Sequence, residues 1–274
     1  MATPVGNLGD ISRRALEVLG SVDAVAAEDT RVTGQLLAHF GISKRLIAVH
    51  EHNERRVVNQ VLALLAAGQS LALTCDAGTP GISDPGAVVV AAARAAGFPV
   101  TPVPGPNAAI AALSVSGIVA PHFLFYGFLP AKAAARRKAL ASLARLPYTL
   151  VFHEAPHRVE ECVADLIAAL GGERHIVLAR ELTKLFESVH SCTLAEAPAW
   201  LASDPKRRKG EFVLIVEGAG PEKEEDDGFA QRALAVLLDE LPLKQAVNLA
   251  AKIAGGKKNE LYRMALAMRK KRDS

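Results

Sequence analysis

The residues best suited to chemistry lie in "LTCDAGTPGISDPGA" at 73–87, where glycines, prolines and aspartates follow an apolar run. Several glycines let the backbone come close to a bound molecule, and the prolines keep such a loop stiff. A second stretch of this kind, "VPGPNA" at 103–108, follows the next apolar run. Because open α/β sheets bind ligands outside their strand ends, these two stretches predict one shared pocket.

The composition of the first loop indicates its ligand. The loop matches neither GxxxxGK[ST] nor GxGxxG, so the two standard phosphate cradles are not supported. Residues 73–87 hold two aspartates, Asp76 and Asp84, and no lysine or arginine. This favours a cationic or zwitterionic ligand with hydroxyl groups over a nucleoside triphosphate. S-adenosylmethionine, with its sulfonium, ammonium and ribose diol, has this chemistry.

Two patterns that resemble metal sites do not predict one. "HEAPH" at 153–157 fits HExxH, which binds zinc when a helix places both histidines on one face. Pro156 separates these histidines and an apolar run precedes His153, so we expect a strand end followed by a helix start. The three cysteines have no CxxC spacing and suggest neither a disulfide framework nor a thiolate site.

The elements that position the loops follow from periodicity. Over residues 1–118 the expected strands are "DAVAAED", "RLIAVH", "SLALTCD" and "FPVTPVP", each followed by a helical stretch. The helix after the first loop is expected to have Asp84 as its N-cap and Pro85 in its first turn. This alternation predicts βαβ units and a mostly parallel sheet.

A second α/β domain is expected over 119–219. Its runs "RHIVLAREL", "LFESVHSCTL" and "GEFVLIVEG" arrive with little helix between them, which predicts antiparallel pairing. The stretch 220–228 is acidic, which predicts a solvated linker. Residues 229–274 form a basic helical appendage that we expect to bind RNA. The fold class is therefore α/β, with two domains and a small C-terminal helical unit.

The net charge is only +3, but its distribution is uneven. Residues 241–274 hold nine Lys/Arg and two acids, and basic runs also occur at 131–145 and at 206–209, "KRRK". Each run alone is explained by a solvated surface, but together they favour a polyanionic partner. No window approaches the roughly 20 apolar residues of a membrane span and no apolar signal segment begins the chain, so we expect a cytosolic location without membrane attachment.

The appendage has the pattern of two helices joined at Gly255 and Gly256, similar to a helix-turn-helix. Its apolar residues at helical spacing predict one small buried face, formed by Leu249, Ile253, Leu261 and Met264. Cations at a helix N-terminus oppose the helix dipole, so helix stability does not account for Lys257 and Lys258. Contact of these two lysines and Arg263 with RNA phosphates would explain their presence.

Motifs along nearly the whole chain resemble a known family. They are, in order, "TPVGNLGDISRRALEVL", "AAEDTRVTGQLL", "HEHNERR", "DAGTPGISDPG", "VPGPNA", "FYGFLP", "HEAPHRV", "ARELTKLFE" and "KGEFVLIVEG". Together they are similar to the ribosomal RNA small-subunit methyltransferase I family, which has the tetrapyrrole-methylase fold. The resemblance implies a homodimer, with S-adenosylmethionine in a cleft between two α/β domains. It also implies methyl transfer to the ribose 2'-oxygen of a cytidine in the decoding region of 16S rRNA, in the small ribosomal subunit.

The resemblance also implies a set of cofactor-binding residues. They are Pro4, Gly6, Asp76, Ala77, Gly78, Ile82, Ser83, Asp84, Pro104, Gly105, Asn107, Ala108, Phe128, Glu154, Ala179 and Arg180. One departure stands out: relatives place an apolar strand before "TPxGNL", whereas here only Met1 and Ala2 precede the motif. We therefore expect a first sheet that lacks a member, or pairing supplied by a partner chain.

Methyl transfer to a hydroxyl requires a proton acceptor, because the hydroxyl loses its proton as the new bond forms. Asp29, His50 and Glu54 follow expected strands at the ligand-facing edge and are the candidates. The structural alternative is that Asp29 caps a helix beginning near Thr30 and that Glu54 is a solvated first-turn residue. Candidates for holding RNA phosphates in the body of the protein are Arg31, Arg55 and Lys184.

Two other functions remain open from the residues. A tetrapyrrole methyltransferase would share the fold and the pocket but has no use for a basic tail. A non-catalytic RNA-binding module would explain the tail but not the Gly/Pro pocket. An RNA methyltransferase explains both features and is favoured.

Overall fold

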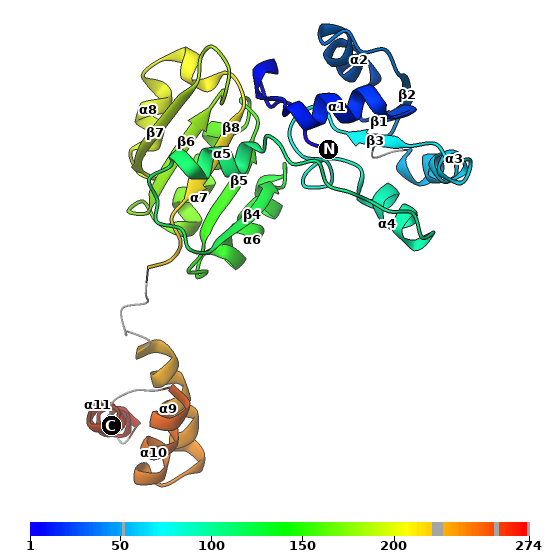
Figure 1. The fold of residues 1–274 in the computed structure, drawn as a ribbon. Coiled ribbons are helices and arrows are strands. Elements are labelled where there is room, and N and C mark those ends of the chain that lie inside the picture. The colour runs from blue at the N-terminus through cyan, green and yellow to red at the C-terminus, as the bar shows by residue number, and fades with distance from the viewer. Residues whose placement is uncertain (51–52, 221–226, 255–257, 273–274) are drawn as a thin grey trace. The chain divides into compact units, whose positions relative to one another are not determined.

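The computed structural model describes residues 1–50, 53–220, 227–254 and 258–272. Two compact units divide the chain, Met1–Gly218 and Ala219–Ser274 (Figure 1). Among the described residues no helix is long and apolar enough to cross a membrane.

The first half of the larger unit, which we term the N-terminal lobe, is built on a three-stranded parallel sheet of order β2-β1-β3. The strands are β1 (Ala24–Ala27), β2 (Arg45–Ala48) and β3 (Leu71–Thr74). The central strand β1 is fully buried, and Ala24 lies opposite both Arg45 and Leu71. Around the sheet lie η1 (Leu8–Asp10), α1 (Arg13–Ser21), α2 (Thr30–His39), α3 (Glu54–Ala66) and α4 (Ala87–Ala95).

Some helices are capped by the side chain directly before them. The side chains of Ser12 and Asp29 accept backbone N–H groups at the starts of α1 and α2. Helix α4 is different, because its N-cap is Gly86, at φ +134, and not Asp84 as expected. The prediction for Asp84 was wrong because the carboxylate of Glu54, distant in sequence, accepts the first N–H groups of α4.

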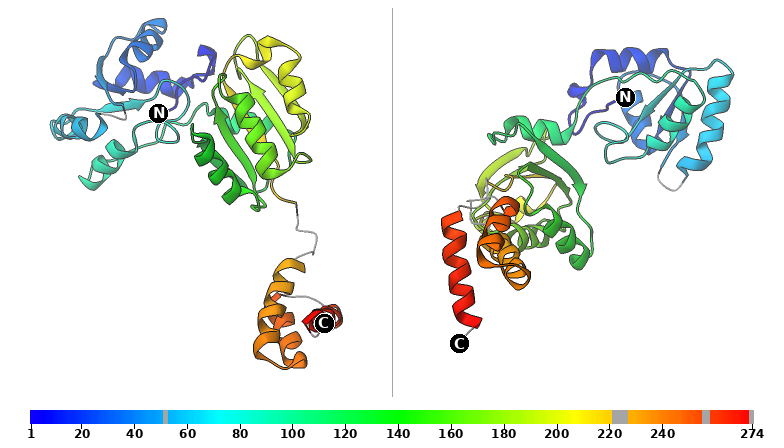
Figure 2. Two further views of the ribbon diagram at one scale, coloured as in Figure 1. Left: turned by 180° about the vertical axis from the view of Figure 1, so that it is seen from behind. Right: turned by 90° about the horizontal axis from the view of Figure 1, so that it is seen from below.

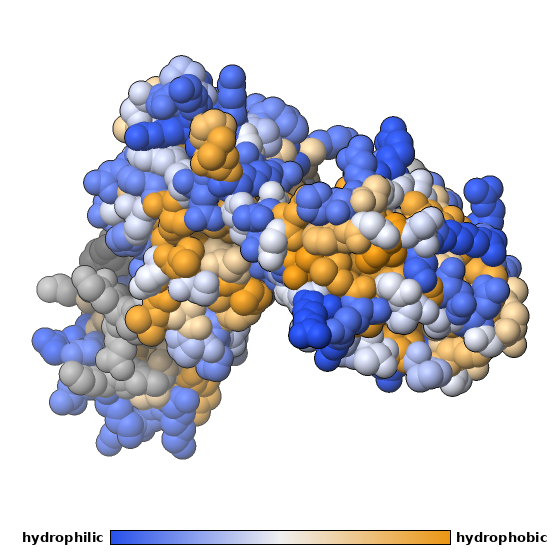
Figure 3. Space-filling view, turned by 45° about the horizontal axis from the view of Figure 1, so that its top comes forward, coloured by the Kyte–Doolittle hydropathy of each residue, from blue (hydrophilic) through white to orange (hydrophobic). Residues whose placement is uncertain are grey.

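The fourth strand expected over residues 98–104 does not form. Pro99, Pro102 and Pro104 lack an N–H, so they cannot complete a ladder. Residues 1–3 lie between this segment and β3, since Met1 N bonds to Leu73 O and Ala2 N to Val103 O. This sheet therefore has three strands among the described residues, and hydrophobic residues gather on the surface of this lobe (Figure 3).

The second half of the unit, the second lobe, has a five-stranded mixed sheet of order β4-β5-β8-β6-β7. Its strands are β4 (Phe123–Phe128), β5 (Thr149–Glu154), β6 (His175–Arg180), β7 (Ser188–Thr193) and β8 (Phe212–Val216). β4 runs parallel to β5, while β8 pairs antiparallel with β5 and β6, and β7 antiparallel with β6. The predicted antiparallel pairing is confirmed.

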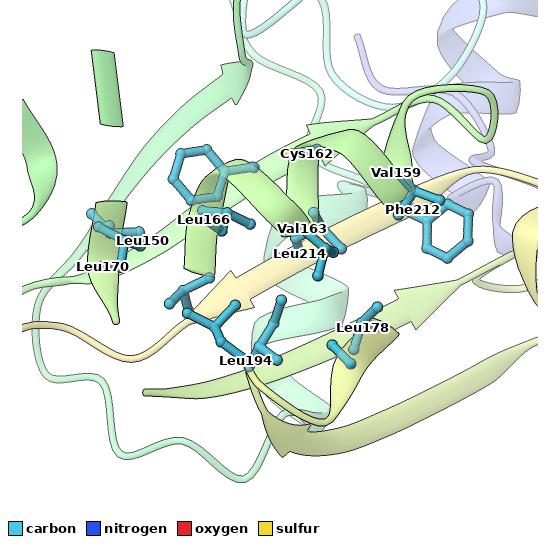
Figure 4. Packing of buried hydrophobic residues seen from close by; sticks show 14 of the residues in the cluster. Leu150, Val159, Cys162, Val163, Leu166, Leu170, Leu178, Leu194, Phe212 and Leu214 are labelled. Carbon is cyan, nitrogen blue, oxygen red and sulfur yellow. The ribbon is translucent and has the colours of Figure 1, made fainter. Parts of the chain in front are cut away.

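Helices cover both faces of this sheet (Figures 1 and 2). Helix α5 (Ala108–Val115) packs Ala109 and Ala112 on one face, so it contacts the second sheet although the predicted boundary at 118/119 assigns it to the first domain. Side chains of α7 (Val159–Leu170) point towards β5, β6 and β8 on the other face (Figure 4). The same face carries α6 (Ala133–Leu143) and α8 (Ala197–Ala202), and η2 (Pro205–Arg208) follows α8.

The unit Ala219–Ser274 contains α9 (Asp227–Glu240), α10 (Leu243–Ala254) and α11 (Lys258–Arg272). Its core holds Leu261 as expected, with Met264 packed against it. Leu249 and Ile253, expected in the core, are 42% and 53% exposed. The prediction failed because α9, which the two-helix interpretation did not include, packs instead on the stripe formed by Ala246, Val247 and Ala250.

Candidate functional site

A cavity of about 420 Å³ lies within the Met1–Gly218 unit. The N-terminal lobe contributes Val5 and the loop after β3, and the second lobe contributes the ends of β4, β5 and β6, the start of β8 and the start of α5, which packs on its sheet. Its lining residues are Val5, Ala77, Gly78, Thr79, Ile82, Ser83, Asp84, Asn107, Ala108, Phe128, His153, Glu154, Ala155, Pro156, His157, Ala179, Leu182, Glu211, Phe212 and Val213.

The two Gly/Pro-rich stretches line this one cavity. Thr79 Oγ1 donates to Pro106 O, and Gly78 exchanges backbone hydrogen bonds with Thr3. Gly78 has φ +79, a left-handed conformation that side chains disfavour. A Cβ at Gly78 would meet no protein atom closer than Pro106 O at 3.9 Å, so the glycine leaves open space at the cavity wall.

The cavity includes only part of the predicted cofactor set. The predicted residues that line it are Ala77, Gly78, Ile82, Ser83, Asp84, Asn107, Ala108, Phe128, Glu154 and Ala179. Those that lie outside the lining are Pro4, Gly6, Asp76, Pro104, Gly105 and Arg180. In the N-terminal segment Val5 is the lining residue, while Gly6 faces Lys184, whose Cγ would clash with a Cβ there.

Three carboxylates gather at one side of the cavity. Asp76 Oδ1 accepts from Asp29 N, Asp76 N donates to Glu28 Oε2, and Asp84 lines the cavity. Burial raises the pKa of Glu28, and the nearby charges of Asp84 and Asp76 add to that rise. Burial likewise raises the pKa of Asp84, with a further contribution from Asp76. A cationic ligand would relieve this repulsion.

The three predicted catalytic residues do not line the cavity. Asp29 caps α2 and forms a bidentate contact with Arg31, whose hydrogen bonds lower the pKa of Asp29 to about 2. Glu54 is buried and caps α4, so the interpretation of Glu54 as a solvated first-turn residue is wrong. His50 lies before α3, where its backbone N–H donates to Asn53 Oδ1.

The three candidates for holding RNA phosphates in the body of the protein differ in their surroundings. Arg31 is engaged with Asp29, and Arg55 is exposed in the first turn of α3. Lys184 Nζ lies 3.0 Å from both Glu181 Oε1 and Glu211 Oε2. Partial burial alone would lower the pKa of Lys184, but its hydrogen bonds to these two carboxylates outweigh burial and raise it.

In the C-terminal unit, Lys258 and Arg263 are exposed on α11. Lys257 lies outside the described residues.

The chain matches two family models, Tetrapyrrole (Corrin/Porphyrin) Methylases over residues 2–198 and the RsmI C-terminal HTH domain over 223–269. It is 53% identical to the Ribosomal RNA small subunit methyltransferase I of Escherichia coli, over 96% of this chain and 92% of that protein. It is also 53% identical to the protein of the same name from Pseudomonas aeruginosa, over 97% of this chain and 95% of that protein. The chain belongs to the ribosomal RNA small subunit methyltransferase I family. Family membership makes it a methyltransferase.

Solved structures show the fold of this methyltransferase. The methyltransferase CobJ superposes with a TM-score of 0.57 at 18% identity, covering 77% of this chain and 89% of that chain. The uroporphyrin-III C-methyltransferase of Thermus thermophilus complexed with S-adenyl homocysteine gives 0.52 at 19% identity, covering 77% and 92%. Both support the tetrapyrrole-methylase fold for the Met1–Gly218 unit.

The second lobe of the methyltransferase contributes lining residues that sequence reasoning missed. His153 packs against Phe125 and Phe128, and burial lowers its pKa, so the imidazole is neutral near pH 7. The signal in the sequence that could have identified His153 is its place at the end of a strand, where α/β proteins bind ligands. His153 ends β5 and His157 lies in the turn before α7, so no single helix presents both, and the described residues contain no group of three or more metal-ligating side chains.

The cavity suits a polar, cationic cofactor such as S-adenosylmethionine. Two buried atoms of its lining, His153 Nε2 and Glu154 Oε2, have no hydrogen-bond partner among the described residues. Buried polar atoms normally have partners, so a polar ligand would satisfy them. Asp84 offers a negative charge, while Ile82, Phe128 and Leu182 supply apolar surface.

Proposed function

We propose that this methyltransferase transfers the methyl group of S-adenosylmethionine to the ribose 2'-oxygen of a cytidine in 16S rRNA of the small ribosomal subunit. The observation that supports the proposal is the cavity described above. The relatives that match almost the whole length of the chain are named for small-subunit rRNA methylation. The cytidine and the 2'-oxygen are expectations from the resemblance of the motifs.

S-adenosylmethionine, when bound, supplies an electrophilic methyl group on a sulfonium. The carboxylate of Asp84 would hold the cationic part of the cofactor, and Glu28 and Asp76 would strengthen the field behind it. The apolar side chains of Ile82, Phe128 and Leu182 would exclude water from the remainder. Gly78 and the four alanines of the lining, Ala77, Ala108, Ala155 and Ala179, have small or no side chains, which would let the cofactor approach the backbone.

The acceptor hydroxyl must lose its proton inside this cavity. A general base acts within hydrogen-bond reach, so Asp29, His50 and Glu54, which do not line the cavity, are not placed to receive it. We therefore place the proton acceptor among the titratable lining residues, which are Asp84, His153, Glu154, His157 and Glu211.

The tetrapyrrole alternative is weaker. The solved tetrapyrrole methyltransferases are 16–21% identical to this chain and establish the fold alone. The C-terminal unit matches the RsmI C-terminal HTH domain, and its exposed cations Lys258 and Arg263 suit an RNA backbone. A tetrapyrrole substrate would make no use of that unit. A ribosomal substrate also places the enzyme in the cytoplasm.

We also propose that the protein is a homodimer. Strand β4 is a sheet edge, and exposed apolar residues lie on it and on the segment before it, among them Val115 at 56%, Val119 at 92% and Phe123 at 41%. Exposed edges and apolar patches of this kind favour pairing with another chain. Light scattering should give about twice the 28.9 kDa chain mass, and a monomeric mass would contradict the dimer.

The deciding experiment incubates the protein and radiolabelled S-adenosylmethionine with small ribosomal subunits from cells that lack the modification. Label should enter 16S rRNA, and the adjacent phosphodiester should resist alkaline hydrolysis because the 2'-oxygen is blocked. Already-modified subunits are the control and should accept no label. Label on a base, or transfer to a tetrapyrrole but not to rRNA, would refute the proposal.

A further inference from the structure

The loop that follows β6 is strained where it borders the cavity. Glu181 and Thr183 have φ of 52° and 65°, a left-handed conformation that these residue types rarely adopt. Leu182 between them lines the cavity. Strain of this kind persists only where the surroundings enforce it, and it concentrates at ligand sites.

The loop is held firmly and still presents apolar side chains to solvent. Lys184 Nζ binds Glu181 and Glu211, and Thr183 N donates to Glu187. Yet Leu185 is 89% exposed and Phe186 is 67% exposed. A fixed loop that exposes large hydrophobic residues indicates a partner surface.

A basic segment lies directly beside this loop. The guanidinium of Arg180 donates to Phe186 O at 3.0 Å and to Lys209 O at 3.1 Å, so one side chain joins the loop to the run "KRRK" at 206–209. Lys206 and Lys209 are exposed, and within the described part of the chain neither ammonium group has an ion-pair or hydrogen-bond partner.

The two central arginines of the run hold it in place. Arg207 lies over the ring of Trp200 at 4.8 Å, and that ring stacks on His190 at 4.5 Å. Arg208 pairs with Glu160. These contacts hold the segment in place, and among the described residues the ammonium groups of Lys206 and Lys209 stay available to bind a partner.

We propose that Phe186, Lys206 and Lys209 form a surface, the rim platform, that binds single-stranded rRNA beside the nucleotide entering the cavity. Phe186 stacks on a nucleobase and the two lysines contact phosphates, a combination by which proteins hold single strands. Lys184 offsets one of the two negative charges of Glu181 and Glu211, and Lys206 and Lys209 add two exposed cations beside them. This inference rests on the proposed function, because the platform is assigned to the same RNA.

The first test reverses the two lysine charges with Lys206→Glu and Lys209→Glu together. The matched control is Arg45→Glu with Arg94→Glu, which changes the net charge equally at exposed positions of the N-terminal lobe, outside the basic runs. We expect KM for modification-free small subunits to rise at least about tenfold in the first variant only. The dependence of log affinity on log salt should flatten by roughly 0.7 for each lost phosphate contact. Equal effects in both variants would show a general charge effect and overturn the platform.

The second test removes the ring with Phe186→Ala, and the control is Phe40→Ala, at a partly exposed phenylalanine directly after α2. Loss of a stacked base should lower kcat/KM about 5- to 100-fold, and Phe186→Trp should restore it. S-adenosylmethionine affinity and the mass in solution should not change. A change in mass would assign Phe186 to an interface between chains, and unchanged kcat/KM would refute the stacking.

The wild-type protein separates the two proposals. If it methylates no rRNA, the proposed function fails. If it methylates rRNA and the platform variants do so with unchanged KM and salt dependence, only the platform is wrong.

Discussion

Replacing Glu54 tests whether this carboxylate is structural or catalytic. Its Oε1 accepts from Gly86 N at 2.8 Å and from Val88 N at 2.9 Å, and more weakly from Val89 N at 3.4 Å. Glu54→Ala removes two good charge-assisted bonds at the start of α4 and leaves the N–H groups in a largely buried place. Bonds to charged groups contribute about 1.5–3 kcal/mol each and helix caps about 1 kcal/mol, so the loss should be about 3 kcal/mol.

The assay is thermal unfolding followed by circular dichroism. In a domain of this size about 1 kcal/mol shifts Tm by roughly 2–4 °C, so Glu54→Ala should lower Tm by about 6–12 °C. Glu54→Gln keeps an acceptor oxygen and the side-chain volume, and should lower Tm by less than half of that.

Activity of the same two variants completes the test. A lost general base typically costs about 10²- to 10⁴-fold in kcat, and Glu54→Gln would show that loss in full. We expect instead that Glu54→Gln retains kcat within a few-fold. A native Tm in Glu54→Ala combined with abolished turnover in Glu54→Gln would refute the capping assignment and restore Glu54 as the catalytic base.

Three further predictions follow from the cavity and from the division into two units. Gly78→Val strains a backbone at φ +79, so circular dichroism must first show that it folds. The folded variant should not bind S-adenosylmethionine in calorimetry, because the nearest protein atom to the added Cβ is Pro106 O at 3.9 Å and the side chain would occupy the cavity; normal binding would mean that the cofactor lies elsewhere. Burial raises the pKa of Asp84 above 3.8, and the cofactor affinity should fall as the pH drops through this pKa, because protonation removes the charge that attracts the sulfonium. Asp84→Asn should bind the cofactor weakly and with a flatter pH dependence. An equally steep pH dependence in Asp84→Asn would exclude Asp84 as the group that titrates. Removal of residues 219–274 should leave the affinity for the cofactor intact and weaken binding to the small subunit. The slope of log affinity against log salt should also flatten by about 0.7–0.9 for each lost phosphate contact. An equal loss of cofactor affinity would show that this unit is part of the catalytic fold.

Local signals in the sequence predicted much of the fold. Asp29 precedes a helical stretch and caps α2, as one interpretation stated. The run over 71–74 followed by glycines forms β3 and the cavity loop. These features depend on neighbours in the chain, so propensity and spacing were sufficient to find them.

Features that depend on distant residues were not predictable in this way. Glu54 caps a helix that begins at Ala87, and no spacing rule connects these positions. Leu249 and Ile253 have helical spacing, but the face that is buried was decided by α9. The failed strand over 98–104 is an exception, because its prolines were visible in the sequence and argued against a ladder.

The place of β8 in its sheet has a consequence for synthesis of the chain. This strand is fully buried and carries the ladders to both β5 and β6, yet it is the last strand of the Met1–Gly218 unit to be made. While residues 212–216 are still inside the ribosome's exit tunnel, β5 has no partner on one side, and the β6–β7 hairpin has nothing to join. Folding of the second lobe must therefore wait for its final strand, and a nascent chain stalled before that point exposes two apolar strand edges to aggregation.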